Sequence, residues 1–333
     1  MMRVLVITNL YPTDEEPSFG TFVKNQVEDL RRLGVEIDVL FINGRKHKWH
    51  YLLGPFRLWA RLLRRRYHLI HCHYIFSGII GRLQWLYPVV VTHHGIEIID
   101  GSWVSALAKK AHPWFNRVIV VNQQLKEELN DPNIAVIPCG INLNQMKPMP
   151  QAEARAALNL PPDKKLILWA GEHWRPEKRF HLVEAAVKRV QLDMPEAELV
   201  LVSGQPHSVI PYYMNACDVL VLTSTHEGSP MVIKEAMACN LPVVSTDVGD
   251  VAQVIEGVEG CYLCRPDVED IAEKILRVLR WGRRTNGREK IWPLSAEFAA
   301  RQIVDVYNQL CPPSVRLELP PLPTGNLTEQ GSQ

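Results

Sequence analysis

The sequence predicts an α/β protein made of two doubly wound, Rossmann-like domains that face each other across a cleft. Short, nearly continuous apolar runs alternate with amphipathic stretches, a pattern typical of parallel strands covered by helices on both faces. The alternation stops in a segment rich in Pro, Asn and Gln, 140–163, and then restarts. The length of 333 residues suits two domains of roughly 150 residues each.

The first predicted domain spans residues 1–145. Its first helix, 21–33, is expected to end at Gly34, because glycine readily adopts the left-handed conformation that often follows a helix. The apolar runs that predict its strands are 4–7, 35–41, 69–72, 89–92, 118–121 and 135–137.

The second predicted domain spans residues 146–294, and the linker at 140–163 is expected to contain a short helix. A final helix, 295–310, is expected to pack back onto the first domain, and the Pro-rich segment 311–333 is expected to be a disordered tail. The runs that predict strands here are 166–170, 199–202, 219–222 and 243–245, and those that predict helices are 180–190, 230–238 and 268–279.

Charge is unevenly distributed along the chain, although the net charge is only +1. Residues 1–150 hold 18 Lys and Arg against 12 Asp and Glu, and the excess concentrates in 45–66, which contains no acid. Such a segment could meet phosphate or an anionic membrane. No apolar run is long enough to span a bilayer, and the N-terminal run is too short for a secretory signal. Together with seven cysteines in no paired framework, this predicts a cytoplasmic protein.

Apolar residues recur at helical spacing within the basic segment, and two interpretations are open. The slightly favoured one is a helix whose apolar stripe faces the core while its arginines face solvent. The other is a membrane-surface helix, which would make the protein peripheral on the cytoplasmic face of the inner membrane. The stripe consists of Leu52, Phe56, Trp59, Leu63 and Tyr67.

The strongest signal for chemistry lies in LTSTHEGSPMVIKEAMACNLPVV, residues 222–244. Ser229 is placed to cap a helix whose first position is Pro230, and Gly228 leaves the preceding turn open to close backbone approach. Free N–H groups from Ser229 to Met231, together with the positive end of the helix dipole, favour a diphosphate at this helix start.

Two carboxylates flank this predicted anion site. Glu227 precedes the helix, and Glu235 lies eight residues later, inside it. Because acids repel phosphate, we expect both to accept hydrogen bonds from sugar hydroxyls instead. On spacing alone, an ordinary capped helix with a surface pair of Glu residues is about equally well supported.

A second signal is WAGEHWRPEKR, residues 169–179, between a predicted strand and a predicted helix. Cations there would face the diphosphate and stabilise negative charge on the leaving group. Lys178 and Arg175 are the candidates, with His173 as the alternative to Arg175. Taken alone, the segment is more typical of a solvated charged turn.

Two further loops follow predicted strands. In VVVTHHGIEI, residues 89–98, His94 stands beside a glycine at a strand end, so we expect it to face the cleft, where it could donate to a sugar hydroxyl or take a proton. A lone histidine is nevertheless more often structural. In PSFGT, residues 17–21, Gly20 leads into a helix start where backbone could meet phosphate or acceptor, without the G-x-G-x-x-G fingerprint of dinucleotide sites.

No metal site is predicted. The Cys pair in CYLC, residues 261–264, lacks a second ligand pair nearby, so zinc is not expected. Asp247 and Asp250 in TDVGDV would suit a cation by residue type alone.

These motifs together resemble family 4 (group 1) glycosyltransferases, which have the GT-B fold, and HEGSPMVIKEAMACNLPVVSTDVGDV is similar to a bacterial subgroup that includes teichuronic-acid-type members. The resemblance runs over about residues 4–310. It implies that Glu227 contacts the donor sugar and Glu235 the ribose, as in the E-x7-E element. It implies that Lys178, with Arg175 or His173, binds the diphosphate, and that no metal or cofactor is needed.

The same resemblance places His94 in the T-x-H-G motif, Glu97 at the acid that follows it, and Gly20 in the N-terminal glycine loop. It departs at Glu172, where relatives carry the Arg that directly follows the glycine. We therefore expect a retaining enzyme that moves a hexose from a UDP- or GDP-sugar to a glycan or lipid-linked acceptor, with no nucleic-acid partner. A sugar-nucleotide epimerase and a non-catalytic nucleotide-sugar-binding subunit are the alternatives.

Overall fold

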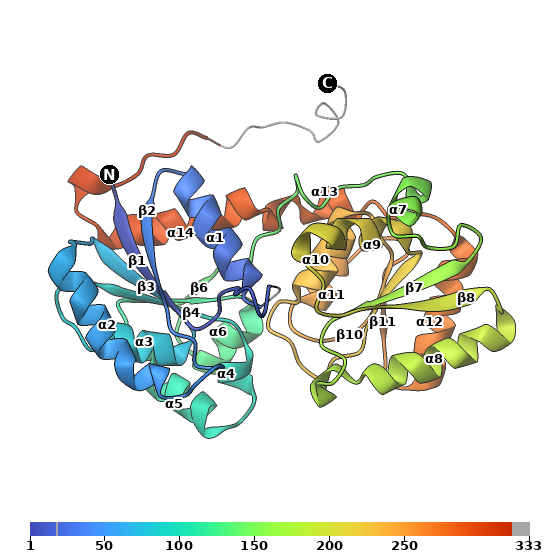
Figure 1. Cartoon of the computed structure of the whole chain (residues 1–333), viewed down its shortest axis with the longest axis horizontal. Coiled ribbons are helices and arrows are strands. Elements are labelled where there is room, and N and C mark those ends of the chain that lie inside the picture. The colour runs from blue at the N-terminus through green and yellow to red at the C-terminus, as the bar shows by residue number, and fades with distance from the viewer. Residues whose placement is uncertain (18, 322–333) are drawn as a thin grey trace.

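The computed structural model describes residues 1–17 and 19–321. Two parallel β-sheets, each with helices packed on it, lie side by side along the long axis of the molecule (Figure 1). The predicted pair of Rossmann-like domains is therefore confirmed. Among the helices of these residues, none combines the length and the apolar character needed to cross a bilayer.

The first sheet has six parallel strands in the order β2-β1-β3-β4-β5-β6. Its strands are β1 (Arg3–Thr8), β2 (Glu36–Phe41), β3 (Leu69–His73), β4 (Val89–His93), β5 (Arg117–Val120) and β6 (Ala135–Val136). The helices between them are α1 (Thr21–Arg32), α2 (His50–Arg64), α3 (Ile75–Arg82), α4 (Ile96–Ile99), α5 (Trp103–Ala111) and α6 (Gln123–Leu129). Gly34 follows α1 with φ +93°, as predicted.

The second sheet has five parallel strands in the order β11-β10-β9-β7-β8. Its strands are β7 (Lys165–Ala170), β8 (Ala197–Val202), β9 (Val219–Leu222), β10 (Val243–Thr246) and β11 (Tyr262–Cys264). The helices are α7 (Gln151–Ala157), α8 (Phe180–Asp193), α9 (Ile210–Ala216), α10 (Met231–Ala238), α11 (Val251–Ile255), α12 (Val268–Trp281) and α13 (Gly287–Ile291).

The two sheets share one topology, which decides where a site can form. In each, the first strand pairs with the second strand on one side and with the third on the other: β1 lies between β2 and β3, and β7 between β8 and β9. The strand order therefore reverses beside β1 and beside β7. Ligands of such sheets bind outside the carboxyl ends of the strands at this reversal.

The last helix, α14 (Ala296–Leu310), returns to the first domain and packs beside α1 (Figure 1). Val304 and Tyr307 are fully buried in the same core cluster as Val6 of β1. The chain that follows departs from the expected disorder, because residues 311–321 pack on this surface and Leu317 exchanges two hydrogen bonds with Asn308. The rest of the expected tail, 322–333, lies outside the described residues.

The apolar stripe expected to face the core on the basic segment is wrong for α2. Leu52, Phe56 and Leu63 are 74%, 74% and 84% exposed, while Trp59 is half-buried and Tyr67 is buried. The buried residues of α2 are Gly54, Leu58 and Leu62. Glycine lets this second stripe approach α3, because a Cβ on Gly54 would lie 2.6 Å from the side chain of Ile80.

Candidate active site

A cavity of about 580 Å³ opens between the two domains at the carboxyl ends of both sheets. Loops that follow β1, β2, β3 and β4 line it from the first domain, and loops that follow β7, β8 and β9 line it from the second. The cavity therefore lies at both reversals of strand order. Its polar and charged lining residues are Glu15, Glu16, Arg45, Tyr74, His94, Glu97, Glu172, Arg175, Glu177, Lys178, His226 and Glu227.

The pair of Lys178 and Glu227 joins two of these loops. Lys178 lies in a 3-10 turn, Pro176–Lys178, just before α8, and its Nζ donates to Glu227 Oε1 at 2.5 Å. The hydroxyl of Ser224 donates to the same oxygen at 2.6 Å. The two charged side chains are 20% and 16% exposed, so they meet in a partly dehydrated place where the interaction is stronger than at the surface. The structure thus brings together two candidate residues from separate sequence motifs.

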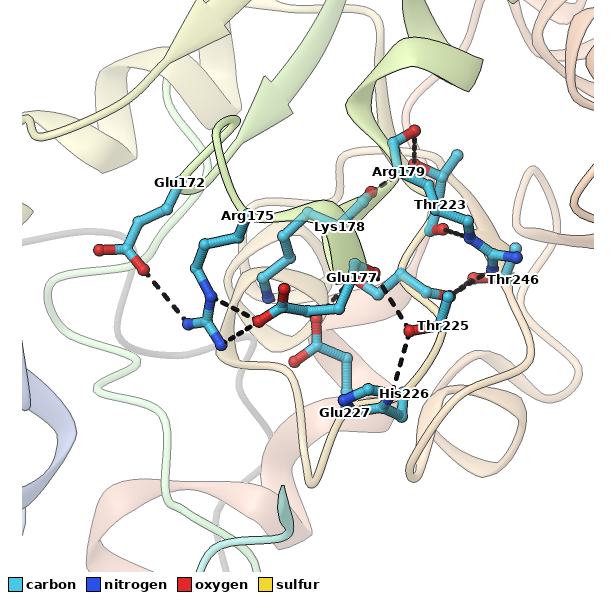
Figure 2. Close-up of polar contacts among 11 residues, drawn as sticks. Glu172, Arg175, Glu177, Lys178, Arg179, Thr223, Thr225, His226, Glu227 and Thr246 are labelled. Carbon is cyan, nitrogen blue, oxygen red and sulfur yellow. Dashed lines mark hydrogen bonds and ion pairs between the residues drawn. The ribbon is translucent and has the colours of Figure 1, made fainter. Parts of the chain in front are cut away.

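Arg175 also lines the cavity, and its guanidinium lies between two carboxylates (Figure 2). It donates to Glu177 at 2.6 Å and to Glu172 at 3.2 Å. Burial opposes the charged form, but the two carboxylates outweigh it and raise the pKa of Arg175. From the first domain, Arg45 approaches Glu172 at 4.0 Å and Glu16 at 3.3 Å. Arg45, Arg175 and Lys178 are therefore each paired with a carboxylate of the cleft.

His94 lines the cavity as expected, but its ring nitrogens face protein. Nε2 lies 3.0 Å from Nδ1 of His73, so one nitrogen donates to the other, and Nδ1 lies 3.8 Å from Cys139 Sγ. Burial lowers the pKa of His94 to about 3. Glu97 accepts from the backbone N–H of His94 at 2.8 Å. A neutral, enclosed imidazole of this kind holds the loop after β4 in place and carries no positive charge at neutral pH.

Gly20 reaches the cavity through a backbone that a larger residue would disturb. Its φ is +68°, and a Cβ there would lie 2.3 Å from the carbonyl carbon of Leu10. The segment after β1 can therefore fold tightly against the start of α1, which exposes the first turn of α1 to the cleft. His173, the alternative to Arg175, is not among the lining residues of the cavity.

Three glycines allow the loops of the two domains to touch. A Cβ on Gly228 would lie 1.8 Å from the carbonyl oxygen of His94, and one on Gly95 would lie 2.7 Å from Gly228 Cα. A Cβ on Gly249 would lie 2.4 Å from Gly228 O, the oxygen that accepts a hydrogen bond from Asn122 of the first domain. The backbone of Gly228 is thus enclosed on both sides beside Glu227.

The predicted helix cap at Ser229 is wrong. The helix α10 begins at Met231 after Pro230, with no side-chain cap. The Ser229 hydroxyl donates instead to the Asp250 carboxylate, which also lies 3.7 Å from the buried ammonium of Lys234. A capping side chain accepts a hydrogen bond from a backbone N–H of the first turn, but here Pro230 occupies the cap position and Ser229 lies one residue before it. Asp250, considered above as a cation ligand, is held by these two groups.

The helix-start residues Ser229, Pro230 and Met231, and Glu235 further along the helix, are not among the lining residues of the cavity. Glu235 is 6% exposed, and its Oε1 lies 2.8 Å from Nε2 of His207. This hydrogen bond raises the pKa of His207. His207 could not be recognised from the sequence, since a single histidine in the short segment between β8 and β9 gives no signal by spacing. Within residues 1–17 and 19–321, no three His, Cys, Asp or Glu side chains gather as a metal site requires.

Comparison with known families assigns both domains. Residues 2–145 match the model described as Glycosyltransferase Family 4, and residues 164–280 match the model described as Glycosyl transferases group 1. Together the two models cover most of the chain. The chain belongs to the family 4, group 1 glycosyltransferases. The expected family is therefore confirmed.

Relatives agree with this assignment. A protein named for teichuronic acid biosynthesis, the glycosyltransferase TuaC of Bacillus subtilis, is 28% identical over 83% of this chain and 89% of its own length. The D-inositol 3-phosphate glycosyltransferase of Thermobispora bispora is 25% identical over 69% of this chain and 66% of its own. Both relatives are named as glycosyltransferases, in agreement with the family of this chain.

Solved structures show the same fold. Sucrose-phosphate synthase from Thermosynechococcus elongatus superposes with a TM-score of 0.78 at 22% identity, covering 93% of this chain and 99% of that one. HepE from Anabaena, in complex with UDP and glucose, gives a TM-score of 0.71 at 16% identity, covering 93% and 100%. The glycosyltransferase therefore has the GT-B fold, as predicted.

Proposed function

We propose that this glycosyltransferase moves a hexose from a nucleotide-diphosphate sugar, a UDP- or GDP-sugar, to a glycan or lipid-linked acceptor, with retention of configuration, during cell-surface polysaccharide synthesis. The observation that carries the proposal is the Lys178–Glu227 pair in a cleft lined by both domains. A cation and a carboxylate side by side suit the two halves of such a donor, the charged diphosphate and the polar sugar. HepE, a neighbour in fold, is described with UDP and with UDP-glucose.

The mechanism rests on exchange of ion-pair partners. A diphosphate entering the cleft would attract Lys178 and Arg175 away from Glu227, Glu172 and Glu177, because it carries more charge than any one carboxylate. The released Glu227 would then accept hydrogen bonds from sugar hydroxyls. The two cations would stabilise the charge that develops on the leaving diphosphate. Since no carboxylate is assigned as a nucleophile, we favour a front-face route in which the leaving diphosphate helps to deprotonate the acceptor. The neutral His94 would hold the loop after β4 against the donor sugar.

Thermal stability with UDP, GDP, ADP and CMP tests the donor site. A nucleotide present at 100 times its dissociation constant adds ~2.7 kcal/mol to the free energy of unfolding. We expect one of UDP and GDP to give such a shift and Lys178→Ala to lose most of it. Lys188→Ala, an exposed lysine of α8, is the matched control and should keep the shift. A shift that survives in Lys178→Ala, or no shift with any nucleotide, contradicts the proposed site.

The sugar donor that carries the stabilising nucleotide then distinguishes a transferase from an epimerase and from a non-catalytic binding subunit. With radiolabelled sugar, a transferase releases free nucleotide only when an acceptor is present, whereas an epimerase changes the sugar while it stays on the nucleotide. A non-catalytic subunit binds the donor and does neither.

We place the reaction on the cytoplasmic side of the inner membrane, where the protein would be peripheral. The seven cysteines, all within the described residues and none in a disulfide, support a reducing compartment.

A further inference from the structure

Large apolar side chains are exposed together on the outer side of the first domain. On α2, Leu52, Phe56 and Leu63 are 74%, 74% and 84% exposed, and Trp85, in the turn after α3, is 78% exposed. The ring of Trp85 lies against Trp59 of α2, with centroids 5.4 Å apart, so the turn and the helix form one surface. Isolated exposed apolar residues are ordinary, but a contiguous group of large ones marks an interaction site.

The apolar residues of α2 lie on one line. Positions 52, 56 and 63 fall within about 40° of one another when successive residues turn by about 100°. This line is distinct from the buried one at Gly54, Leu58 and Leu62 that packs on the domain core. The helix is therefore apolar on two sides, and one of them has no partner among the described residues.

Arginines occupy the side of α2 between the exposed line and the buried one, about 80–140° around the axis from the nearest exposed apolar position. Arg57, Arg61 and Arg64 are all exposed on the same helix, and none forms an ion pair with an acid in residues 1–17 or 19–321. Arg65, by contrast, is paired with Glu36 and Asp38. Three unpaired cations beside Leu, Phe and Trp are the composition of a helix that lies in the headgroup region of an anionic membrane.

A second copy of the chain fits this surface poorly. In a two-fold dimer, each patch meets an identical patch, so the arginines of both copies would be brought together. Repulsion between them would oppose the apolar contact, since no acidic residue occurs anywhere in 45–66 to compensate. A negatively charged lipid surface satisfies both the apolar and the basic part at once.

We propose that the outer face of α2 and the turn at residues 83–86 dock the protein onto an anionic lipid bilayer. The segment that carries α2 also carries Arg45, which lines the cavity five residues before the helix begins. The docked face is thus continuous along the chain with the cleft. A lipid-linked acceptor diffusing in the same bilayer would meet the cleft without leaving the membrane; this last step rests on the proposed function, whereas docking itself does not.

Flotation of the full-length protein with lipid vesicles tests the proposal. We expect it to float with vesicles of phosphatidylglycerol and phosphatidylcholine in equal amounts, to bind phosphatidylcholine alone far more weakly, and to be released as salt is raised. The double variant Phe56→Ser/Leu63→Ser should bind at least about tenfold more weakly. The triple variant Arg57→Gln/Arg61→Gln/Arg64→Gln should lose roughly a hundredfold on the anionic vesicles, at about a fivefold loss for each of the three cations.

Matched substitutions on the second domain are the controls. Leu192→Ser, at a residue that is 77% exposed, and Arg280→Gln/Arg283→Gln, at two exposed arginines, should bind as the wild type does. The α2 variants should fold, because the substituted positions are exposed, and circular dichroism checks this. Lys178→Ala should float unchanged, so that a failure of the donor site and a failure of docking are told apart.

Three outcomes would overturn the proposal. The first is a wild-type protein that does not float with anionic vesicles. The second is equal binding by the α2 variants and their controls. The third is a dimer in sedimentation that the Phe56→Ser/Leu63→Ser variant abolishes, which would assign the surface to a second copy.

Discussion

At Gly228 the backbones of the two domains are in contact, and its lack of a side chain has a testable consequence. In Gly228→Ala the new methyl group would overlap the carbonyl oxygen of His94, 1.8 Å from the Cβ position, so the loops must separate. Because misplacement by about 1 Å can cost about a hundredfold in rate, we expect transfer to fall by roughly that factor. Small-angle X-ray scattering should show a larger radius of gyration.

The control for Gly228 is a glycine that has a positive φ but open space around its Cβ position. Gly257 has φ +68° and nothing within 4 Å of a Cβ position, so Gly257→Ala should cost about 1 kcal/mol of stability through backbone strain alone. Its scattering and its rate of transfer should match those of the wild type. Wild-type compactness and rate in Gly228→Ala would mean that the closed contact has no part in catalysis.

Residue types could be assigned to the site from the sequence, but their partners could not. Lys178 and Glu227 were recognisable because each follows a strand, and carboxyl ends of parallel strands share one edge. Ser229 was taken for a cap because its acceptor, Asp250, lies 21 residues further along the chain, where spacing is uninformative. The pairing of His207 with Glu235 was hidden for the same reason.

At the scale of elements, α14 illustrates how a distant helix becomes part of another domain. The hydroxyl of Tyr307 lies 2.6 Å from Nδ1 of His71 on β3, and both side chains are fully buried. Tyr307→Phe keeps the ring but leaves that nitrogen unpaired, which should cost about 1–3 kcal/mol in the free energy of unfolding measured with urea.

The control for the α14 contact is a tyrosine at the surface. Tyr212→Phe, on α9 at 36% exposure, removes a hydroxyl from an exposed ring and should change the free energy of unfolding by less than about 0.5 kcal/mol. Equal effects in the two variants would show that the hydrogen bond to β3 contributes nothing to the docking of α14.

The elements themselves were predictable where one face had to be apolar. Buried parallel strands read as short continuous apolar runs, so β9 was found at its true bounds. The buried side of α2 was harder to predict, because its two apolar lines have the same period and the sequence does not say which of them meets the core. The choice depends on Gly54, whose missing side chain admits Ile80, a tertiary contact that no local pattern contains.

At the scale of the whole molecule, buried histidines should make stability depend on pH in opposite senses in the two domains. Burial lowers the pKa of His71 and of His94 to about 3 and that of His73 well below its usual value. In the unfolded chain each titrates near pH ~6.5, so between about pH 6.5 and about pH 3 the unfolded chain binds more protons. The first domain should therefore lose stability as the pH falls through this range.

The second domain should respond at the other end of the range. The hydrogen bond with Glu235 raises the pKa of His207, so its contribution is complete below about pH 6.5 and is lost as the pH rises through the raised value. Calorimetry as a function of pH checks both trends. Below about pH 6.5, on the acid limb of the curve, we expect the free energy of unfolding to fall by up to about 1.4 kcal/mol per pH unit for each buried histidine. His207→Gln should remove the alkaline loss and leave the acid limb unchanged. If His207→Gln also flattens the acid limb, the titrating groups are coupled across the cleft, and the two domains do not respond to pH independently.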